Sequence, residues 1–382
     1  MNVEELQQSI REYAAYIGID KIGFTTAEPF VELKHRLIRH RELGYESGFE
    51  EKDIEKRTTP TLLLDGAQSI ISIAVAYPSK MEGGGPKSTR TERRGLFCRA
   101  SWGVDYHTVL HEMLAELEAY IQLLVPGAKC KSMVDTGELS DRAVAERAGI
   151  GWSGKNCSII TPEFGSYVYL GEMITNIPFH PDEPLEDQCG DCTLCMDVCP
   201  TSALVQPGQL NAQRCIAYIT QTKDPVPLEF RDKIGNRVYG CDTCQMVCPK
   251  NRKKYNLHQK AFQPEGELVK PVLRDLLTLS NRQFQRKFGH MSGAWRGKNP
   301  IQRNAIIALA HFKDETAIPD LAELLKNDHR PMIRSTCAWA LGEIGTNESK
   351  VILEEVLMKE RESSVRKEIE RALEQLKKEV EA

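Results

Sequence analysis

The stretch CGDCTLCMDVCP at residues 189–200 places four cysteines at spacings of three, three and four residues, and a proline follows the last of them. Bacterial ferredoxins share this pattern: the first three thiolates hold one 4Fe-4S cluster and the fourth reaches across to a second. A second cysteine run is therefore expected. It is found in CDTCQMVCP at residues 241–249, which lacks only the first cysteine of the pattern, and Cys215 lies upstream to supply it.

The eight cysteines of these runs are sufficient for two clusters. We predict one cluster on Cys189, Cys192, Cys195 and Cys248, and the other on Cys199, Cys215, Cys241 and Cys244. Two structural zinc sites are the alternative, because CxxC pairs commonly bind zinc. Zinc knuckles need neither a third cysteine three residues on nor a proline after each terminal cysteine, so the sequence favours clusters. Such clusters conduct single electrons but select no substrate.

The length and composition indicate a large protein with redox chemistry. A chain of 382 residues is long enough for two or three domains. It shows no signal segment at its start and no run of eighteen apolar residues, so a cytoplasmic location without membrane insertion is expected. In such a chain, twelve cysteines indicate metal or redox chemistry in place of disulfides.

The charge is distributed unevenly along the chain. The formal net charge is −4, but residues 250–303 contain thirteen Lys or Arg against three Asp or Glu, which makes this segment +10 and the remainder −14. A run of charge is usually a solvated face. An excess of ten in an otherwise acidic protein favours binding to a polyanion such as nucleic acid.

The predicted elements give an α+β multidomain chain. Residues 1–180 are expected to form a mixed α/β domain, with helices at 2–17, 104–124 and 140–149, strands at 20–26, 67–78 and 131–136, and a hairpin at 157–175. Residues 181–255 hold the cysteine runs and are expected to form a ferredoxin-like domain with two 4Fe-4S clusters.

Residues 256–382 are expected to be helical and repetitive. The pair Ala-Leu recurs at intervals of 32 residues, beginning at Ala308, Ala340 and Ala372. Arg334 and Arg366 share a repeat position that Gln302 fills in the first copy. This period predicts stacked helical hairpins of the HEAT type, with an ordinary helical bundle as the alternative.

Two familiar cofactor motifs are absent or altered. No GxGxxG follows the predicted strands, so a Rossmann nucleotide site is not expected. Asp105-Tyr106-His107 is similar to the DxHxxG histidine motif of corrinoid proteins, but Leu110 replaces its glycine. A helix that begins here with Asp105 at its N-terminus is favoured over metal ligation by His107.

Several segments together resemble one protein family along nearly the whole chain. ASWGVDYH (100–107), VDTGELSDRAVAERAGIGWSGKN (134–156), the two cysteine runs and the helical repeat follow one another as in the epoxyqueuosine reductase family. Glu138 departs from the proline expected there, and RASWG replaces the more usual RYAWG. The resemblance implies a cobalamin-dependent enzyme with two 4Fe-4S clusters that removes the epoxide oxygen of epoxyqueuosine at the tRNA wobble position, giving queuosine.

The same resemblance suggests roles for residues of the α/β domain. It places the proton donor at Asp135, whose carboxyl must be protonated when substrate binds, so burial is expected to raise its pKa. A strand-end aspartate that caps a turn is the alternative. Positions similar to those that line the corrinoid are Arg57, Ser140, Asp141, Arg142, Lys155 and Asn156, and Cys98 is a candidate to face the cofactor. Cys130, Cys157 and Cys337 are expected to be small core residues.

The basic segment is expected to bind the anticodon stem-loop of tRNA. The candidates for phosphate contacts are Arg252, Lys253, Lys254, Arg282, Arg296, Lys298 and Arg303. Cobalamin would cycle between cob(II)alamin and cob(I)alamin without a protein histidine ligand, fed by an external low-potential electron donor. Reductive dehalogenation of a small organohalide, and a non-catalytic scaffold for electron transfer or tRNA binding, remain alternatives.

Overall fold

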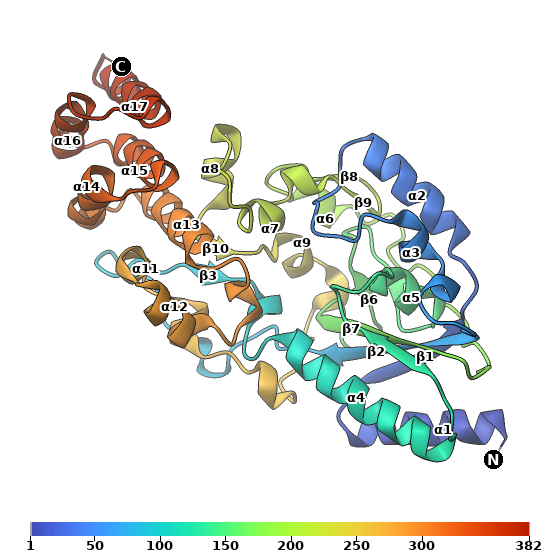
Figure 1. The fold of residues 1–382 in the computed structure, drawn as a ribbon. Helices are drawn as coiled ribbons and strands as arrows, with labels where there is room; N and C mark the ends of the chain where they lie inside the picture. Colours follow the sequence, from blue (N-terminus) through green and yellow to red (C-terminus); the bar gives the residue numbers. More distant parts are fainter. Residues whose placement is uncertain (1, 382) are drawn as a thin grey trace. The chain divides into compact units, whose positions relative to one another are not determined.

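The computed structural model describes residues 2–381, which fall into two compact units by their internal contacts. The first unit comprises residues 1–80, 103–215 and 242–263, and the second comprises 81–102, 216–241 and 264–382. Each unit is therefore assembled from segments that lie far apart in the sequence, as the colours of Figure 1 show.

A four-stranded antiparallel sheet forms the centre of the first unit. Its order is β1 (Lys21–Thr26), β2 (Ser69–Ala76), β7 (Val168–Thr175) and β4 (Cys130–Met133). Every residue of β2 is buried, which explains why this central strand is almost continuously apolar in sequence. In the register of the sheet, Glu172 of β7 lies opposite Ser72 of β2 and Met133 of β4.

Helices cover both faces of this sheet (Figure 1). On one face lie α1 (Val3–Tyr16) and α4 (Tyr106–Leu124), which contact each other; α4 approaches Gly171 of β7 through Leu114. The other face is covered by α5 (Asp141–Arg147), which packs on both central strands. Helices α2 (Val31–Glu42) and α3 (Ile54–Thr58) complete the α/β part of the unit.

The hairpin predicted at 157–175 is wrong. Strand β6 (Ile159–Ile160) pairs with β5 (Trp152–Ser153), whereas β7 enters the middle of the main sheet between β2 and β4. Two adjacent apolar runs joined by a turn suggest a hairpin locally, but the long apolar β7 buries more surface in the sheet centre.

The cysteine runs of the first unit form short helices. The first run contains α6 (Leu194–Asp197) and the second contains α9 (Thr243–Met246), and the two helices contact each other. A small two-stranded ribbon, β8 (Leu204–Gln206) and β9 (Gln209–Leu210), follows the first run.

The second unit is mainly helical. It contains α7 (Ile216–Ile219), α8 (Leu228–Ile234), α10 (Gly266–Val269), α11 (Leu273–Thr278) and α12 (Asn281–Phe288), with one parallel pair between β3 (Leu96–Phe97) and β10 (Arg237–Tyr239). Its C-terminal part is the series α13 (Lys298–His311), α14 (Ile318–Asn327), α15 (Pro331–Ile344), α16 (Asn347–Leu357) and α17 (Ser363–Glu381).

The predicted helical repeat is confirmed. Helices α13, α15 and α17 pack side by side, and α14 and α16 lie against them, so each copy is a helical hairpin (Figure 1). The polar repeat position has a structural role: Gln302, Arg334 and Arg366 donate hydrogen bonds to the carbonyl oxygens of Leu277, Asp328 and Leu357, respectively. Each bond satisfies a carbonyl at or near the end of an earlier helix (α11, α14 and α16, respectively), where the last carbonyls lack intrahelical partners.

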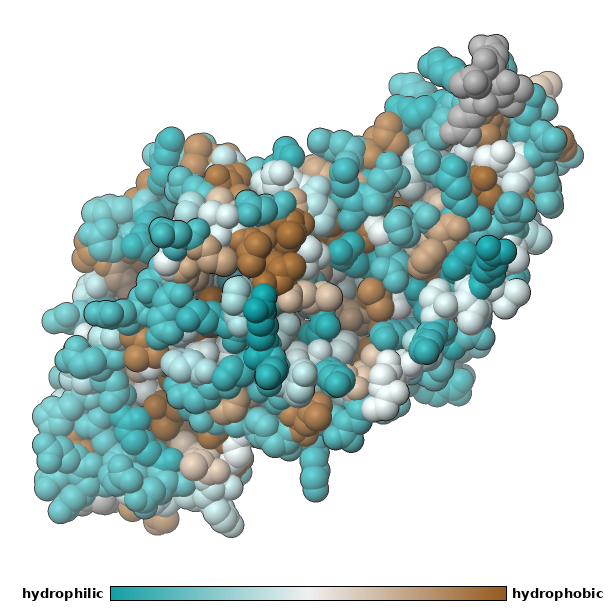
Figure 2. Space-filling model, turned by 180° about the vertical axis from the view of Figure 1, so that it is seen from behind, coloured by the Kyte–Doolittle hydropathy of each residue, from teal (hydrophilic) through white to brown (hydrophobic). Residues whose placement is uncertain are grey.

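Within the described residues, no helix is both long and apolar enough to cross a membrane. Hydrophilic side chains cover most of the face shown in Figure 2, with hydrophobic ones in smaller groups.

Candidate functional site

Four cysteines line one pocket in the first unit. Cys189, Cys192, Cys195 and Cys248 line a pocket open to solvent, together with Lys155, Asn156, Ile160, Gln188, Leu194, Pro249 and Lys250. Burial raises the pKa of the thiols of Cys195 and Cys248, and nearby cysteines raise it further. The fold therefore brings together the four residues predicted to hold one cluster, although they come from both cysteine runs.

The other predicted ligands lie on separate short elements. Cys199 ends the turn after α6, Cys215 follows a 3-10 turn, and Cys244 lies in α9, all in the first unit, whereas Cys241 belongs to the second unit. Burial alone would raise the pKa of Cys199, but hydrogen bonds from the backbone around Thr201 and Ala203 lower it. A lowered thiol pKa favours the thiolate, which is the form that binds iron.

Asp135 lies just beyond β4, at the centre of a hydrogen-bonded group. Its φ angle is 49°, a left-handed conformation that is uncommon for residues other than glycine and clusters at functional sites. Tyr106 donates a hydrogen bond of 2.8 Å to its Oδ2, and Nε2 of His107 lies 3.4 Å from the same oxygen. The Asp135 side chain keeps 58% of its surface exposed, so solvent or a ligand can reach it.

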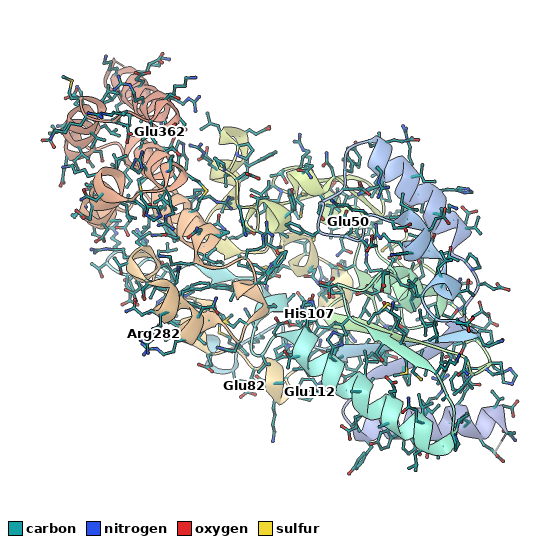
Figure 3. All side chains as sticks on the ribbon, viewed as in Figure 1. Glu50, Glu82, His107, Glu112, Arg282 and Glu362 are labelled. Atoms are coloured by element: carbon teal, nitrogen blue, oxygen red, sulfur yellow. The ribbon has the colours of Figure 1, made fainter. Side chains whose placement is uncertain are left out.

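His107 lies in the first turn of α4 (Figure 3). Its Nδ1 is 2.8 Å from Oδ1 of Asp105, which also accepts the backbone N–H of His107 as the N-cap of the helix. The sequence-based expectation of a helix N-terminus capped by Asp105 is confirmed.

The expected pKa of Asp135 is corrected by these contacts. Burial alone would raise it, but His107 and Tyr106 lower the pKa of Asp135 overall. Burial alone would lower the pKa of His107, and the two aspartates raise it to about 9. At neutral pH the proton of this pair therefore resides on the imidazole ring.

The segment after Asp135 supplies further polar groups. Ser140 is the N-cap residue of α5, and Asp141 accepts a hydrogen bond of 3.1 Å from the backbone N–H of Asp135. Burial, together with the charge of Asp135, raises the pKa of Asp141 to about 6. Arg142 donates to the carbonyl of Cys157, and Arg57 lies close enough for Arg142 and Asp141 to act on its pKa, which burial lowers. Asp141 and Arg142 therefore act directly on Asp135, Ser140 precedes them in the chain, and Arg57 lies near both of them.

The remaining predicted cofactor contacts lie elsewhere. Lys155 and Asn156 border the pocket of four cysteines, and Lys155 donates to the carbonyl of Gly190. In the part of the chain that is described, the buried Nδ2 of Asn156 has no hydrogen-bond partner, which suits a site for an added polar group. Cys98 lies in the second unit, where its backbone N–H donates to Tyr239 and its side chain packs on Gly240.

Glu172 was missed by sequence reasoning. It is 1% exposed in the middle of β7, and neither carboxylate oxygen has a hydrogen-bond partner among the described residues. Burial, together with the charges of Asp141 and Asp135, raises its pKa well above the usual value. The signal was present in the sequence, because a lone acidic residue stands in the apolar strand VYLGEMIT.

Six of the seven predicted phosphate contacts in 250–303 fall into two classes, exposed and partly buried. Arg252, Lys253 and Arg282 are exposed, and Arg282 lies on α12 (Figure 3). Lys254 donates to the carbonyl of Pro162, and two others are also partly buried: Arg296 donates to the carbonyl of Gln221, and Lys298 to that of Leu279.

Arg303 is corrected from a phosphate contact to a structural residue. Its surface is 0% exposed, and its guanidinium donates to the carbonyls of Ile219, Thr222 and Asp224 and to Oδ1 of Asn304. These bonds satisfy carbonyls of the segment beside α13, so the side chain cannot reach a phosphate.

Comparisons with known proteins agree with this architecture. A protein-family model described as a 4Fe-4S double cluster binding domain matches residues 188–251. A second family model, described as epoxyqueuosine reductase QueG, DUF1730, matches residues 57–136, and a family model of HEAT repeats matches residues 297–374. The chain thus has a double-cluster domain, which excludes the zinc alternative, and HEAT repeats in place of an ordinary bundle.

Relatives of similar length share most of the chain. The epoxyqueuosine reductase of Bacillus anthracis is 62% identical over 98% of this chain and 99% of its own, and that of Bacillus subtilis (strain 168) is 62% identical over 99% and 97%. A crystal structure of epoxyqueuosine reductase with a tRNA-Tyr epoxyqueuosine-modified stem loop is 62% identical, with a TM-score of 0.96 over 98% of this chain and 100% of that one.

In another solved relative, a loop that carries a catalytic aspartate adopts a different position. This relative is an epoxyqueuosine reductase from Bacillus subtilis, 61% identical with a TM-score of 0.95 over 98% of this chain and 100% of that one, whose catalytic aspartate loop is swung out of the active site. From the identity along nearly the whole chain, the cluster domain and the helical repeat, this protein is an oxidoreductase that belongs to the epoxyqueuosine reductase family.

Proposed function

We propose that this oxidoreductase removes the epoxide oxygen of epoxyqueuosine at the wobble position of tRNA and leaves queuosine. The observation that carries the proposal is the 62% identity to epoxyqueuosine reductases over nearly the full length of both chains. A 62% identical relative has been solved with an epoxyqueuosine-modified tRNA stem loop, which supports tRNA as the substrate. Because tRNA is used in translation, the enzyme acts in the cytoplasm.

The reaction consumes two electrons and two protons. Both carbon–oxygen bonds of the epoxide break, a carbon–carbon double bond forms, and the oxygen leaves as water. One 4Fe-4S cluster would be held by Cys189, Cys192, Cys195 and Cys248, and the other by Cys199, Cys215, Cys241 and Cys244. When bound, the clusters would conduct single electrons from an external low-potential donor. When bound, cobalamin would supply a strongly reducing cobalt centre for this reaction.

The chain offers polar groups for the amide side arms of cobalamin. Around Asp135 these are Arg57, Ser140, Asp141 and Arg142, and near the cysteine pocket they are Lys155 and Asn156. The buried, unpaired Nδ2 of Asn156, stated for the described residues, fits an acceptor on such a group. Cys98 remains a predicted contact, and no histidine of this chain is assigned as a ligand of cobalt.

Asp135 delivers a proton to the leaving oxygen. Because its own pKa is lowered, Asp135 must take that proton from His107, whose pKa is about 9 and whose Nε2 lies 3.4 Å from its carboxylate. Tyr106 orients the same carboxylate through its hydroxyl. A positioned acid of this kind typically increases the rate by ~10²–10⁴-fold.

The chain divides this work among three segments. Residues 1–180 hold cobalamin and the proton donor, 181–255 hold the clusters, and 256–382 form the HEAT-type part that binds tRNA. The exposed cations Arg252, Lys253 and Arg282 are the best candidates for phosphate contacts, and the partly buried Lys254, Arg296 and Lys298 are weaker ones.

Nucleoside analysis tests the proposal. The protein is purified without oxygen, supplied with cobalamin, and incubated with a stem loop carrying epoxyqueuosine and a low-potential reductant. Conversion to queuosine, with about eight irons and one cobalt per chain, is expected. Cluster-loaded, cobalamin-loaded protein that leaves the nucleoside unchanged would contradict it. Reduction of organohalides without conversion would favour a dehalogenase, and absence of cobalt would favour a scaffold.

A further inference from the structure

The reaction needs two protons, but the pair of Asp135 and His107 holds only one at neutral pH. The second proton must come from solvent or from another protein group. Glu172 is the described acidic residue whose place in the fold suits this task, because it is a fully buried carboxyl beside the Asp135 segment.

The sheet places Glu172 against that segment. Its cross-strand neighbour on β4 is Met133, two residues before Asp135. Its side chain shares a face of the sheet with Ile174, which belongs to the same hydrophobic cluster as Val144 of α5, and α5 contacts β7. Asp141, the first residue of α5, therefore lies on the same face as Glu172, and the charges of Asp141 and Asp135 both act on Glu172.

Other charged groups around Glu172 are occupied or face away. On β4, Lys131 pairs with Glu138, and β2 carries no titratable residue. On α5, Arg142 donates to the carbonyl of Cys157, Glu146 accepts from Ser153, and Arg147 donates to the carbonyl of Thr26. Helix α4, with His107, His111, Glu112, Glu116 and Glu118, covers the opposite face of the sheet.

We propose that the buried carboxyl group of Glu172 holds the second proton consumed in each turnover and passes it to Asp135 by way of Asp141. The proposal rests on the proposed function. Neither oxygen of Glu172 has a partner among the described residues, nor does the hydroxyl of Ser72 opposite it, so a water molecule can bridge this polar space. After turnover, Glu172 is a carboxylate and regains a proton from solvent.

The direction of transfer follows from the acids involved. Asp141, with a pKa of about 6, is ionised at neutral pH and can accept a proton, whereas burial keeps Glu172 protonated. Transfer from Glu172 to Asp141 is uphill by itself. It becomes downhill once Asp135 has lost its proton to the leaving oxygen, because the hydroxide that leaves is a far stronger base than any carboxylate.

Glu172→Gln is the decisive variant, because it keeps the shape and neutrality of the protonated side chain but carries no transferable proton. In the enzyme loaded with clusters and cobalamin, kcat on the epoxyqueuosine stem loop should fall about tenfold or more at pH 8.5, within the range for acid–base groups. Near pH 6, where solvent protonates Asp141, the loss should shrink to about threefold or less. Glu172→Asp should restore part of the rate at pH 8.5.

Ser132→Ala is the matched control. Its buried hydroxyl also lacks a partner among the described residues, but it is cross-strand from Met173 and therefore on the opposite face. This variant should keep the parental pH profile. Glu172→Gln with parental kcat at pH 8.5, or an equal loss at both pH values, would overturn the proposal.

Thermal melting provides a measurement independent of turnover. Because the pKa of Glu172 is raised in the folded parent, its protonated carboxyl contributes to the free energy of unfolding. This contribution is complete below the usual Glu pKa of about 4.3 and is lost as pH rises through the raised pKa of Glu172. Glu172→Gln should therefore gain melting temperature relative to the parent as pH rises, and an unchanged difference would overturn the proposal. A parent that melts as expected but converts no epoxyqueuosine would instead refute the proposed function, and with it this role for Glu172.

Discussion

At the residue scale, Asp135 and His107 show how one hydrogen-bonded group separates two pKa values. The sequence placed Asp135 at a strand end, where burial was expected to keep it protonated. The fold adds Tyr106 and His107 as partners of its Oδ2, and their effect exceeds that of burial. The proton donor that we propose is therefore the pair of Asp135 and His107, with the proton on His107 at neutral pH.

This arrangement predicts an alkaline limit to activity. Because the pKa of His107 is about 9, kcat/KM should fall as pH rises through about 9, when the pair loses its proton. His107→Gln should lower kcat and should abolish the fall in kcat/KM near pH 9. The same raised pKa contributes stability that is complete below about 6.5 and is lost as pH rises through about 9. A parental pH profile in His107→Gln, measured as initial rates, would exclude the histidine as the proton source.

At the element scale, the repeat depends on close contact between α15 and α17. A Cβ atom at Gly342 would lie 2.7 Å from the Cβ of Ala372, which is too close for the helices to keep their positions. We predict that Gly342→Val lowers the free energy of unfolding of the second unit by about 2 kcal/mol, through overpacking. Glu354→Ala on the exposed side of α16 is the control and should change it by less than about 0.5 kcal/mol. Chemical denaturation checks both, and equal stabilities would contradict the packing.

The predicted ligand set of the second cluster can be tested at Cys215. One predicted cluster needs Cys215, which lies outside both runs, whereas the four cysteines around the pocket do not include it. Cys215→Ala should therefore lose one cluster, about four irons per chain, and retain the other. Cys337→Ala, a buried thiol of α15, should keep the parental iron content. About eight irons in the Cys215 variant would remove this residue from the ligand set.

The elements also show what sequence can predict. The cysteine runs and the helical repeat were identified from spacing alone. In the runs the cluster ligands recur every three or four residues, and in the repeat equivalent residues recur every 32. The burial of Arg303 and Glu172 depends on segments distant in sequence. The lone acidic residue in the apolar strand VYLGEMIT is a local sign of the buried Glu172, whereas no local pattern reveals the burial of Arg303. Arg303 was predicted as a phosphate contact because it ends a basic run, but α13 buries its whole length from Pro300 to Ala310.

At the scale of the whole molecule, the basic segment is expected to provide affinity while the chemistry lies elsewhere. Arg252→Gln together with Lys253→Gln should weaken binding of the stem loop and reduce the log–log salt slope by roughly 0.7–0.9 for each phosphate that the variant no longer neutralises. Iron and cobalamin content should not change. Lys377→Gln with Lys378→Gln, two exposed cations outside the segment, is the control. If both double variants bind with the parental slope, the segment is only a solvated face.

A comparison of the parent with Asp135→Asn under single-turnover conditions tests most directly whether Asp135 protonates the leaving oxygen. The substitution keeps the size of the side chain but removes its ability to transfer a proton. We predict that the variant, loaded with clusters and cobalamin, binds the epoxyqueuosine stem loop as tightly as the parent and forms queuosine at least ~10²-fold more slowly. Parental rates of queuosine formation in Asp135→Asn would contradict the assignment of this carboxylate as the group that protonates the leaving oxygen.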